Sequence, residues 1–350
     1  MSTIERPSDA IAKMPPSDAI AMNAWYVAAW SGEVSTALLP RRIAGKALVL
    51  FRTQRGVTAL ADRCPHRAFP LSAGRLDGDV LTCSYHGFQF DAGGTCLGVP
   101  GQARAPGSAN ARTYPVVERD GAIWVFPGDS ARADAAAIPA HPWLTQWWSA
   151  LGHETIAARA SLLIDNLLDL SHETFLHARG IGTPEVAETP IEVERHGDVL
   201  HVSRRMYGVA CPPSFQASTG LRSPIDRTQE IQFFPPSFYV LHSRLAPAGD
   251  TGHGFHNKVV YGITPETART SHLFYGVCRE LDGRGEIPEA ARQSTQSRTV
   301  GEDKRALELL EAEIAAEPDA PPEVSIGIDR GGLLGRRMIA ELVAREMVTK

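Results

Sequence analysis

The stretches Cys64-Pro-His66 and Cys83-Ser-Tyr-His86 decide the fold of the first third of this 350-residue chain. Each stretch carries one thiol and one imidazole, and sixteen residues separate the two stretches. Five cysteines in so long a chain argue against a disulfide framework and favour metal binding by any clustered pair. The other three have no matching partners and are interpreted as ordinary buried thiols: Cys96, Cys211 and Cys278. The spacing therefore predicts a metal centre held by two loops.

Two kinds of metal centre fit two cysteines and two histidines. In a Rieske [2Fe–2S] cluster, two histidines replace two cysteines on one iron, which raises the reduction potential. A structural zinc ion takes the same four donors. Zinc fingers usually pair cysteine with cysteine, whereas each half is mixed here, so we favour the cluster. Its predicted ligands are Cys64, His66, Cys83 and His86.

The length of the chain predicts two domains. Residues 22–128 contain short strand-like runs at 47–51, 80–83 and 122–126, separated by Gly and Asp turns, and predict an all-β domain around the metal centre. Residues 129–142, rich in Ala, Asp and Pro, predict a linker. Residues 1–21 carry an imperfect repeat and predict a flexible tail, with a short ordered helix as the alternative and both Met1 and Met22 open as the start.

Residues 143–350 predict a second domain of the α+β class. Strand-like pieces at 230–234 and 258–263 follow a helical run at 161–177, and two helices, at about 288–316 and 333–347, close the chain. Strands and helices do not alternate strictly, so we expect an antiparallel sheet with flanking helices, similar to a helix-grip fold.

Charge and hydropathy exclude several classes of partner. The chain has 35 basic and 40 acidic residues, a formal net charge of -5, and no basic run that would favour nucleic acid or a lipid surface. No stretch approaches the roughly 20 apolar residues that span a bilayer, and the N-terminus lacks the pattern of a signal peptide. We therefore expect a cytoplasmic protein with neither nucleic acid nor membrane as a partner.

The helical run from Asp165 to His177 places two histidines, His172 and His177, among apolar residues. Histidines five residues apart diverge by about 140° on an ideal helix. Joint metal binding therefore requires the helix to loosen or end between them. The pattern differs from the His-Glu-x-x-His of zinc proteases. The alternative is a solvated polar stripe made of Asp165, Asp169 and His172.

A carboxylate in the closing helix can complete a site of two histidines and one carboxylate, which holds Fe(II) with open positions. Asp303 falls within an apolar stripe formed by Val300, Leu307, Leu310 and Ile314. A buried carboxylate is costly unless a cation or donors compensate it. Asp303 is thus a better candidate than three glutamates predicted to point away, Glu302, Glu308 and Glu313. The alternative is that Asp303 pairs with a buried arginine.

Taken together, these motifs resemble the Rieske non-haem iron oxygenases, of the vanillate and dicamba O-demethylase type. The segments that carry the resemblance are Asn23–Ala28, Cys64–Arg67, Leu71–Ser72, Cys83–Asp91, Asn166–His177 and Glu302–Lys304. The resemblance implies that His172, His177 and Asp303 bind Fe(II), and it places Asn166 and Asp169 among the catalytic residues. It further implies a homotrimer in which Asp169 links the iron site to His86 of the partner subunit.

The resemblance implies the terminal oxygenase of a monooxygenase, which uses O2 to O-demethylate or hydroxylate a small aromatic compound. Electrons would come from a separate NAD(P)H-dependent flavin and iron–sulfur reductase, because the chain has no dinucleotide fingerprint. Residues expected to line the substrate pocket are His242, Arg244, His256 and Tyr261. The alternatives are a methyl hydroxylase, an N-demethylase, and a Rieske electron carrier whose second domain serves only for docking.

Overall fold

The structure, a computed structural model, describes residues 19–280, 289–321 and 323–348. The chain divides into two compact units. The first holds Met22–Gln146 with Thr264–Ala268, and the second holds Trp147–Ile263 with Arg269–Lys350. The predicted tail at 1–21 lies largely outside the described residues. Within the described part of the chain, no helix is both long and apolar enough to cross a membrane.

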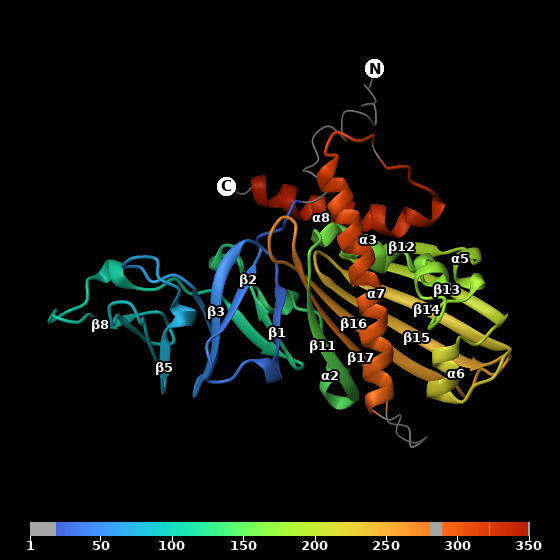
Figure 1. The fold of residues 1–350 in the computed structure, drawn as a ribbon, viewed down its shortest axis with the longest axis horizontal. Coiled ribbons are helices and arrows are strands. Elements are labelled where there is room, and N and C mark those ends of the chain that lie inside the picture. The colour runs from blue at the N-terminus through green and yellow to red at the C-terminus, as the bar shows by residue number, and fades with distance from the viewer. Residues whose placement is uncertain (1–18, 281–288, 322, 349–350) are drawn as a thin grey trace. The chain divides into compact units, whose positions relative to one another are not determined.

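The first unit is built from small antiparallel sheets (Figure 1). One contains β1 (Tyr26–Trp30), β10 (Ala122–Val125) and β9 (Val116–Arg119), and another contains β2 (Leu39–Ile43), β3 (Lys46–Thr53) and β4 (Gly56–Ala61). A third contains β5 (Arg75–Asp77), β6 (Val80–Thr82), β7 (Gln89–Phe90) and β8 (Cys96–Gly98). The three predicted strand runs fall on β3, β6 and β10, which confirms the all-β character of this unit.

Residues 129–142, predicted as a linker, pack against the first unit. The guanidinium of Arg119 donates hydrogen bonds to the carbonyls of Ala135 and Ile138 at 2.9 and 3.2 Å. Ile138 is only 3% exposed. A short helix, α2 (Trp143–Gln146), follows directly. The first compact unit therefore continues to Gln146, because residues 129–142 pack into it and do not form an extended connection.

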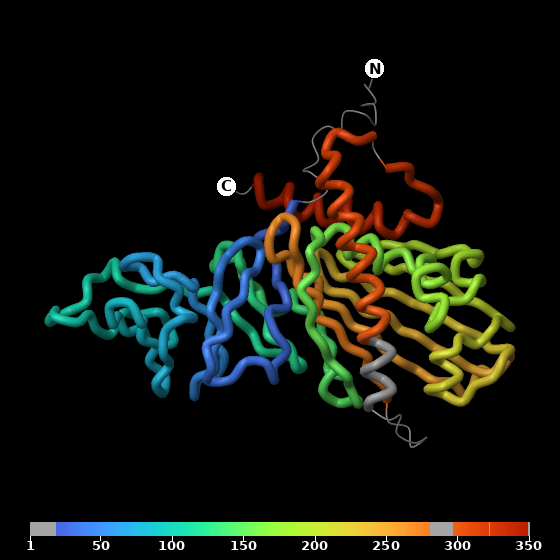
Figure 2. The backbone as a smooth tube through the Cα atoms, in the orientation of Figure 1, coloured from blue at the N-terminus to red at the C-terminus, as the bar shows by residue number. Residues whose placement is uncertain are grey.

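The second unit is built on a seven-stranded antiparallel sheet in the order β11-β17-β16-β15-β14-β13-β12 among the described residues. Its strands are β11 (Trp148–Ile156), β12 (Glu192–His196), β13 (Val199–Val209), β14 (Ile225–Phe234), β15 (Phe238–Pro247), β16 (Phe255–Pro265) and β17 (Ser271–Arg279). Figure 2 shows β11 and β17 side by side, although most of the domain separates them in the sequence. The predicted antiparallel sheet is confirmed.

Helices pack on one face of this sheet (Figure 1). The helices of the unit are α3 (Ala160–Leu168), α4 (Glu173–Leu176), α5 (Pro184–Glu188), α6 (Pro213–Thr219), α7 (Glu289–Ala316) and α8 (Arg330–Val348). A single apolar core joins Leu163 of α3, Val300 of α7 and Met338 of α8 to strand residues that include Phe233 and Tyr261. The two predicted closing helices correspond to α7 and α8.

The predicted helical run at 161–177 is broken. α3 ends at Leu168, and Asp169 adopts extended backbone with φ −122° and ψ 98°. The Asp169 carboxylate accepts the backbone N–H of Ser171, which caps a 3₁₀ turn over Leu170–His172, a role that aspartate favours. α4 then ends at Leu176, with His177 as its C-cap. The helix therefore ends between the two histidines, at Leu176, as expected, whereas the break at Asp169 precedes both. The continuous polar stripe is absent.

Candidate active site

Two loops of matching form present the residues predicted to bind the cluster. In the first loop, the backbone N–H of Cys64 donates to the carbonyl of Phe69 at 2.8 Å. In the second, the N–H of Cys83 donates to the carbonyl of Phe88, also at 2.8 Å. Both loops turn through a residue with positive φ, 57° and 72°, at Ala68 and Gly87. At Gly87 a side chain would also meet the Pro100 ring, 2.9 Å from its Cβ.

In these loops the two cysteines are buried and the two histidines are exposed. Cys64 and Cys83 are 2% and 1% exposed, whereas His66 and His86 lie at the surface. The two imidazole rings have centroids 4.6 Å apart. Burial raises the pKa of the Cys64 thiol, and the adjacent Cys83 adds to the rise. Two adjacent sulfurs and two adjacent nitrogens fit a cluster with one iron held by thiolates and the other by imidazoles.

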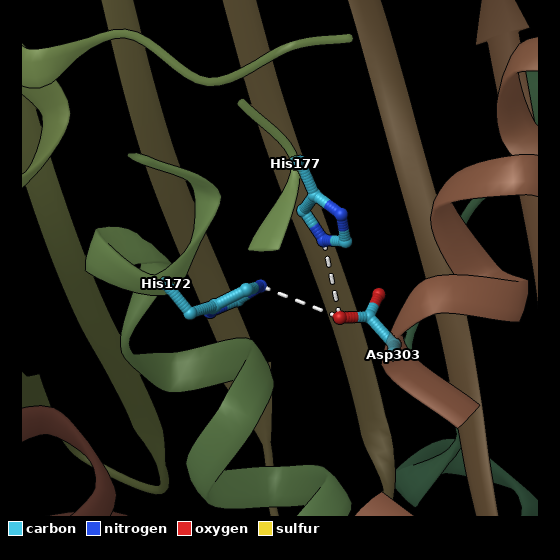
Figure 3. Close-up of side chains that lie close together, drawn as sticks. All are labelled: His172, His177 and Asp303. Atoms are coloured by element: carbon cyan, nitrogen blue, oxygen red, sulfur yellow. Dashed lines mark hydrogen bonds and ion pairs between the residues drawn. The ribbon is translucent and has the colours of Figure 1, made fainter. Parts of the chain in front are cut away.

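His172, His177 and Asp303 converge from segments far apart in the sequence (Figure 3). One potential ligand atom of each lies within 4.8 Å of the other two. The Oδ1 of Asp303 is 3.1 Å from Nε2 of His177 and 3.5 Å from Nε2 of His172. Metal–ligand bonds of about 2.1 Å that meet at about 90–110° separate ligand atoms by about 3.0–3.4 Å. The spacing therefore fits one shared divalent ion.

The burial predicted for Asp303 is confirmed. Asp303 is 5% exposed and lies in line with Val300 and Leu307, which are also buried. Leu310, predicted in the same stripe, is 50% exposed, so that part of the prediction is wrong. The buried residue at that turn of α7 is Glu311, which forms ion pairs with two arginines, Arg159 and Arg269.

Each of the three converging side chains has a further polar partner. Nδ1 of His172 lies 2.6 Å from the carbonyl oxygen of Asp169. Nδ1 of His177 lies 2.7 Å from Oε2 of Glu302, so the prediction that Glu302 points away is wrong. Asp303 accepts a hydrogen bond from the amide of Asn166 at 3.3 Å. Within the described ranges Asp303 pairs with no arginine, and the alternative interpretation of this residue is not supported.

The environment of His177 favours a positive charge on its ring or a cation beside it. Burial by itself opposes protonation of the imidazole. The hydrogen bonds and charges of Asp303 and Glu302 outweigh this effect and raise the pKa of His177. Together with the ligand spacing, this clustering of carboxylates around a buried ring fits a site for a divalent metal ion.

Asp169 contacts His172 differently from the expectation. The resemblance implied that Asp169 links the iron site to His86 of the partner subunit, which requires its carboxylate to contact a ligand histidine. Within the chain, the two carboxylate oxygens accept the backbone N–H and the hydroxyl of Ser171 at 2.8 and 2.9 Å. The carbonyl oxygen of Asp169 binds His172 instead. The Asp169 carboxylate caps the 3₁₀ turn through Ser171, and the backbone carbonyl of Asp169 orients His172.

A buried ion pair, missed by the sequence analysis, fixes the histidine segment to the sheet. Glu173 is 4% exposed and accepts hydrogen bonds from Arg227 at 2.7 Å and from Gln229 at 2.9 Å. Both donors lie on β14. Arg227 also donates to the carbonyl of Ile181, just beyond His177. An acidic residue in the middle of an apolar, histidine-bearing segment was the one available signal.

The four predicted pocket residues do not share one surface. Residues directly opposite on paired strands lie on the same face, and successive residues alternate. Tyr261 is opposite Tyr239 and belongs to the core on the helix-covered face. His242, Arg244 and His256 lie on the opposite face. His242 contacts Gln232, and Arg244 is opposite His256 and donates to a loop carbonyl. A pocket lined by all four is therefore wrong.

Family comparisons identify both parts of the chain. Residues 24–115 match the Rieske [2Fe-2S] domain, and residues 156–345 match the vanillate O-demethylase oxygenase C-terminal domain. The cluster prediction is confirmed over the zinc alternative. The second domain is an oxygenase domain, so the interpretation as an electron carrier with a docking module is not supported.

Individual proteins match over most of the chain. A vanillate O-demethylase oxygenase subunit from a Pseudomonas species is 37% identical over 93% of this chain and 95% of its own length. The dicamba O-demethylase oxygenase component of Stenotrophomonas maltophilia is 34% identical over 83% of this chain and 87% of its own length. The crystal structure of dicamba monooxygenase with non-heme iron and dicamba superimposes with a TM-score of 0.81, at 32% identity, over 95% of this chain and 99% of that one. The chain therefore belongs to the Rieske non-haem iron oxygenases, in the family of the vanillate O-demethylase oxygenase component.

Proposed function

We propose that this protein uses O2 to remove the methyl group from a small aromatic methyl ether, or to hydroxylate such a compound, at an iron held by His172, His177 and Asp303. The observation that carries the proposal is the convergence of ligand atoms of these three side chains within 4.8 Å, with His177 and Asp303 buried and His172 half-buried. The substrate class is supported by the vanillate and dicamba demethylases among its relatives.

The residues of the site would hold and orient the metal. The backbone carbonyl of Asp169 and the carboxylate of Glu302 accept from the Nδ1 atoms of the two histidines, which leaves both Nε2 atoms free to bind. Asn166 holds the Asp303 carboxylate. Iron bound there would supply the oxygen chemistry, in which O2, two electrons and two protons convert a C–H bond to C–OH and release one water. If the C–H bond belongs to an aryl O-methyl group, the hydroxylated group is lost as formaldehyde.

Electrons would enter through Cys64, His66, Cys83 and His86, which we propose as the cluster ligands. The source is a separate reductase, since the sequence has no dinucleotide fingerprint. We propose that this reductase uses NAD(P)H, flavin and its own iron–sulfur centre. We further propose a homotrimer in which Asp169 passes the electron from His86 of the partner subunit. Its carboxylate accepts two hydrogen bonds from Ser171 and keeps further lone pairs for that contact.

Of the predicted pocket residues, Tyr261 alone keeps this role in the proposal. It is 8% exposed, and burial raises its pKa most, with the nearby charge of Asp303 adding to the rise. Its hydroxyl therefore stays protonated and can donate a hydrogen bond to a polar group of an aromatic substrate. Tyr239, opposite it on β15, supplies a second buried ring, with centroids 5.5 Å apart.

Electron paramagnetic resonance on one anaerobic sample tests both metal sites. Reduction with dithionite should give a Rieske signal, and addition of nitric oxide should give a separate iron–nitrosyl signal. The total should be about three iron atoms per chain, two in the cluster and one in the second site. Vanillate-type methyl ethers that perturb the nitrosyl signal should then release formaldehyde in turnover assays with a reductase. A Rieske signal without any nitrosyl signal in iron-loaded protein would refute the proposal.

A further inference from the structure

Glu302 precedes the proposed iron ligand Asp303 but contacts a different ligand. Its Oε2 lies 2.7 Å from Nδ1 of His177, whereas Oδ1 of Asp303 lies 3.1 Å from Nε2 of the same ring. Two consecutive residues of α7 therefore hold one imidazole from both sides. His177 is 2% exposed, so solvent offers little alternative for its Nδ1.

The chemistry of this contact fixes the form of the ring. An ionised carboxylate only accepts hydrogen bonds, so Nδ1 of His177 must carry the proton. Nε2 is then the nitrogen that offers a lone pair to a metal. A carboxylate partner also increases the basicity of a ligand histidine. His172 has only the neutral carbonyl of Asp169 at the corresponding position, so the two histidines are supported unequally.

The contact also joins two separate segments. His177 ends α4, which is tied to the sheet through the ion pair of Glu173 with Arg227. Asp303 comes from α7. The Glu302–His177 bond therefore fixes the distance between the elements that supply two of the three ligands. Asp303 and Glu302 together bring two negative charges to a site for a divalent cation.

We propose, on the basis of the iron site proposed above, that Glu302 is a positioning residue for that site. It sets the tautomer and orientation of His177, and it strengthens the bond of this histidine to the metal. It does not itself bind the metal.

The test is the affinity of the second metal site for Co(II), measured in the full chain with the cluster intact and the mononuclear metal removed by a chelator. Glu302→Gln keeps the shape and an acceptor oxygen but removes the charge, and Glu302→Ala removes the contact. Glu313→Gln, on an exposed position of the same helix, is the control. We expect about 10–100-fold weaker Co(II) binding in Glu302→Ala, a smaller loss in Glu302→Gln, and no change in the control.

A second readout separates positioning from a general structural effect. Glu302→Gln should shift the Co(II) absorption bands while leaving the Rieske signal and the urea midpoint of the metal-free protein unchanged. Affinities within twofold of the wild type, with the same absorption bands, would overturn the inference. So would a loss as complete as that of Asp303→Ala, because Glu302 would then be a ligand. Failure of the wild-type protein to bind Co(II) at all would overturn the iron site itself.

Discussion

His172 and His177 lie at the two ends of the four-residue helix α4, which ends at Leu176. On one continuous helix their side chains would diverge by about 140°. His172 ends a 3₁₀ turn, and His177 leaves the helix with φ −110° and ψ 24°, so the segment that joins them is not one continuous helix. The rings are left with centroids 5.2 Å apart. The end of the short helix α4 before His177 therefore permits the convergence on which the proposed metal site depends.

Replacement of His172 by Ala is expected to abolish product formation while the cluster keeps its visible colour. The substitution removes one of the three proposed metal donors in the second unit, and the proposed cluster loops belong to the first. Iron content should fall from about three to about two atoms per chain. His201→Ala is the control, because His201 alternates with core residues on β13 and lies on the other face of the sheet. Unchanged turnover in His172→Ala would remove this residue from the site.

Glu173→Ala is expected to destabilise the protein by about 3–5 kcal/mol, because it leaves the guanidinium of Arg227 buried without its carboxylate. Arg227 is 2% exposed and Glu173 is 4% exposed, so water cannot replace the lost partner. The urea midpoint measures the effect, with the exposed Glu194→Gln as control. The double variant Glu173→Ala with Arg227→Met should recover part of the loss. A single variant within 1 kcal/mol of the wild type would contradict this account of the pair.

Among the elements, α8 packs closely against the end of α3, which directly precedes the segment 169–177 that carries the two histidines. A Cβ on Gly331 would lie 2.8 Å from the carbonyl oxygen of Leu168, the last residue of α3. It would also lie 3.2 Å from a methyl group of Val202 on β13. Only a glycine at this position lets α8 approach both the helix and the sheet.

Gly331→Ala is therefore expected to cost about 1–3 kcal/mol, the usual penalty for overpacking. Gly327→Ala is a matched control, since a Cβ there meets nothing within 4 Å. Thermal or urea unfolding of the two variants side by side gives the comparison. Equal stability of the two would show that α8 can move away from α3 without cost.

The same pair of helices carries a pH-dependent contribution to stability. Arg336 Nε lies 3.1 Å from Oδ1 of Asp165, but the alignment does not make a hydrogen bond. Burial raises the pKa of Asp165 from 3.8 to about 7, against the opposing charge of Arg336. The folded state then binds a proton more tightly than the unfolded state does. The contribution of this group is fully present below about pH 4 and is lost as pH rises to about 7.

Asp165→Asn should therefore gain stability relative to the wild type as pH rises from 5 to about 8, with no further gain above that pH. One pKa unit corresponds to about 1.4 kcal/mol, so the total change is a few kcal/mol at most. Urea unfolding at several pH values measures it. Asp198→Asn, an exposed carboxylate, should show no such trend. A stability difference between Asp165→Asn and the wild type that is independent of pH would contradict the raised pKa.

At the scale of the whole molecule, local sequence patterns predicted the helices and strands. Contacts between segments far apart in the sequence determined which side chains meet, and these could not be predicted. The Cys and His spacing predicted the cluster loops, and apolar periodicity predicted the burial of Asp303. The position of Glu302 could not be predicted, because the side chain that it contacts belongs to another segment. The pocket prediction failed for a simpler reason. His256 and Tyr261 are five residues apart on one strand, and an odd separation places them on opposite faces.

The division of labour between this chain and a reductase sets a limit on turnover. A chain with a reduced cluster and ferrous iron stores two electrons, the number that one monooxygenation draws from an external donor. Without a dinucleotide fingerprint in its sequence, the chain is not expected to refill this store from NADH. Protein reduced in advance, freed of reductant and then exposed to O2 and a substrate ether should release no more than one formaldehyde per chain.

NADH added to the purified chain should leave this yield unchanged, and a suitable reductase should raise it to many turnovers. The ratio of formaldehyde released to iron content measures the yield with NADH and the yield with a reductase. Asp303→Ala serves as the blank. The blank keeps its cluster and so retains one of the two stored electrons, but it lacks the proposed iron ligand that is 5% exposed at the centre of the site. Sustained turnover with NADH alone would mean that the chain accepts hydride-derived electrons directly, and the requirement for a separate reductase would be wrong.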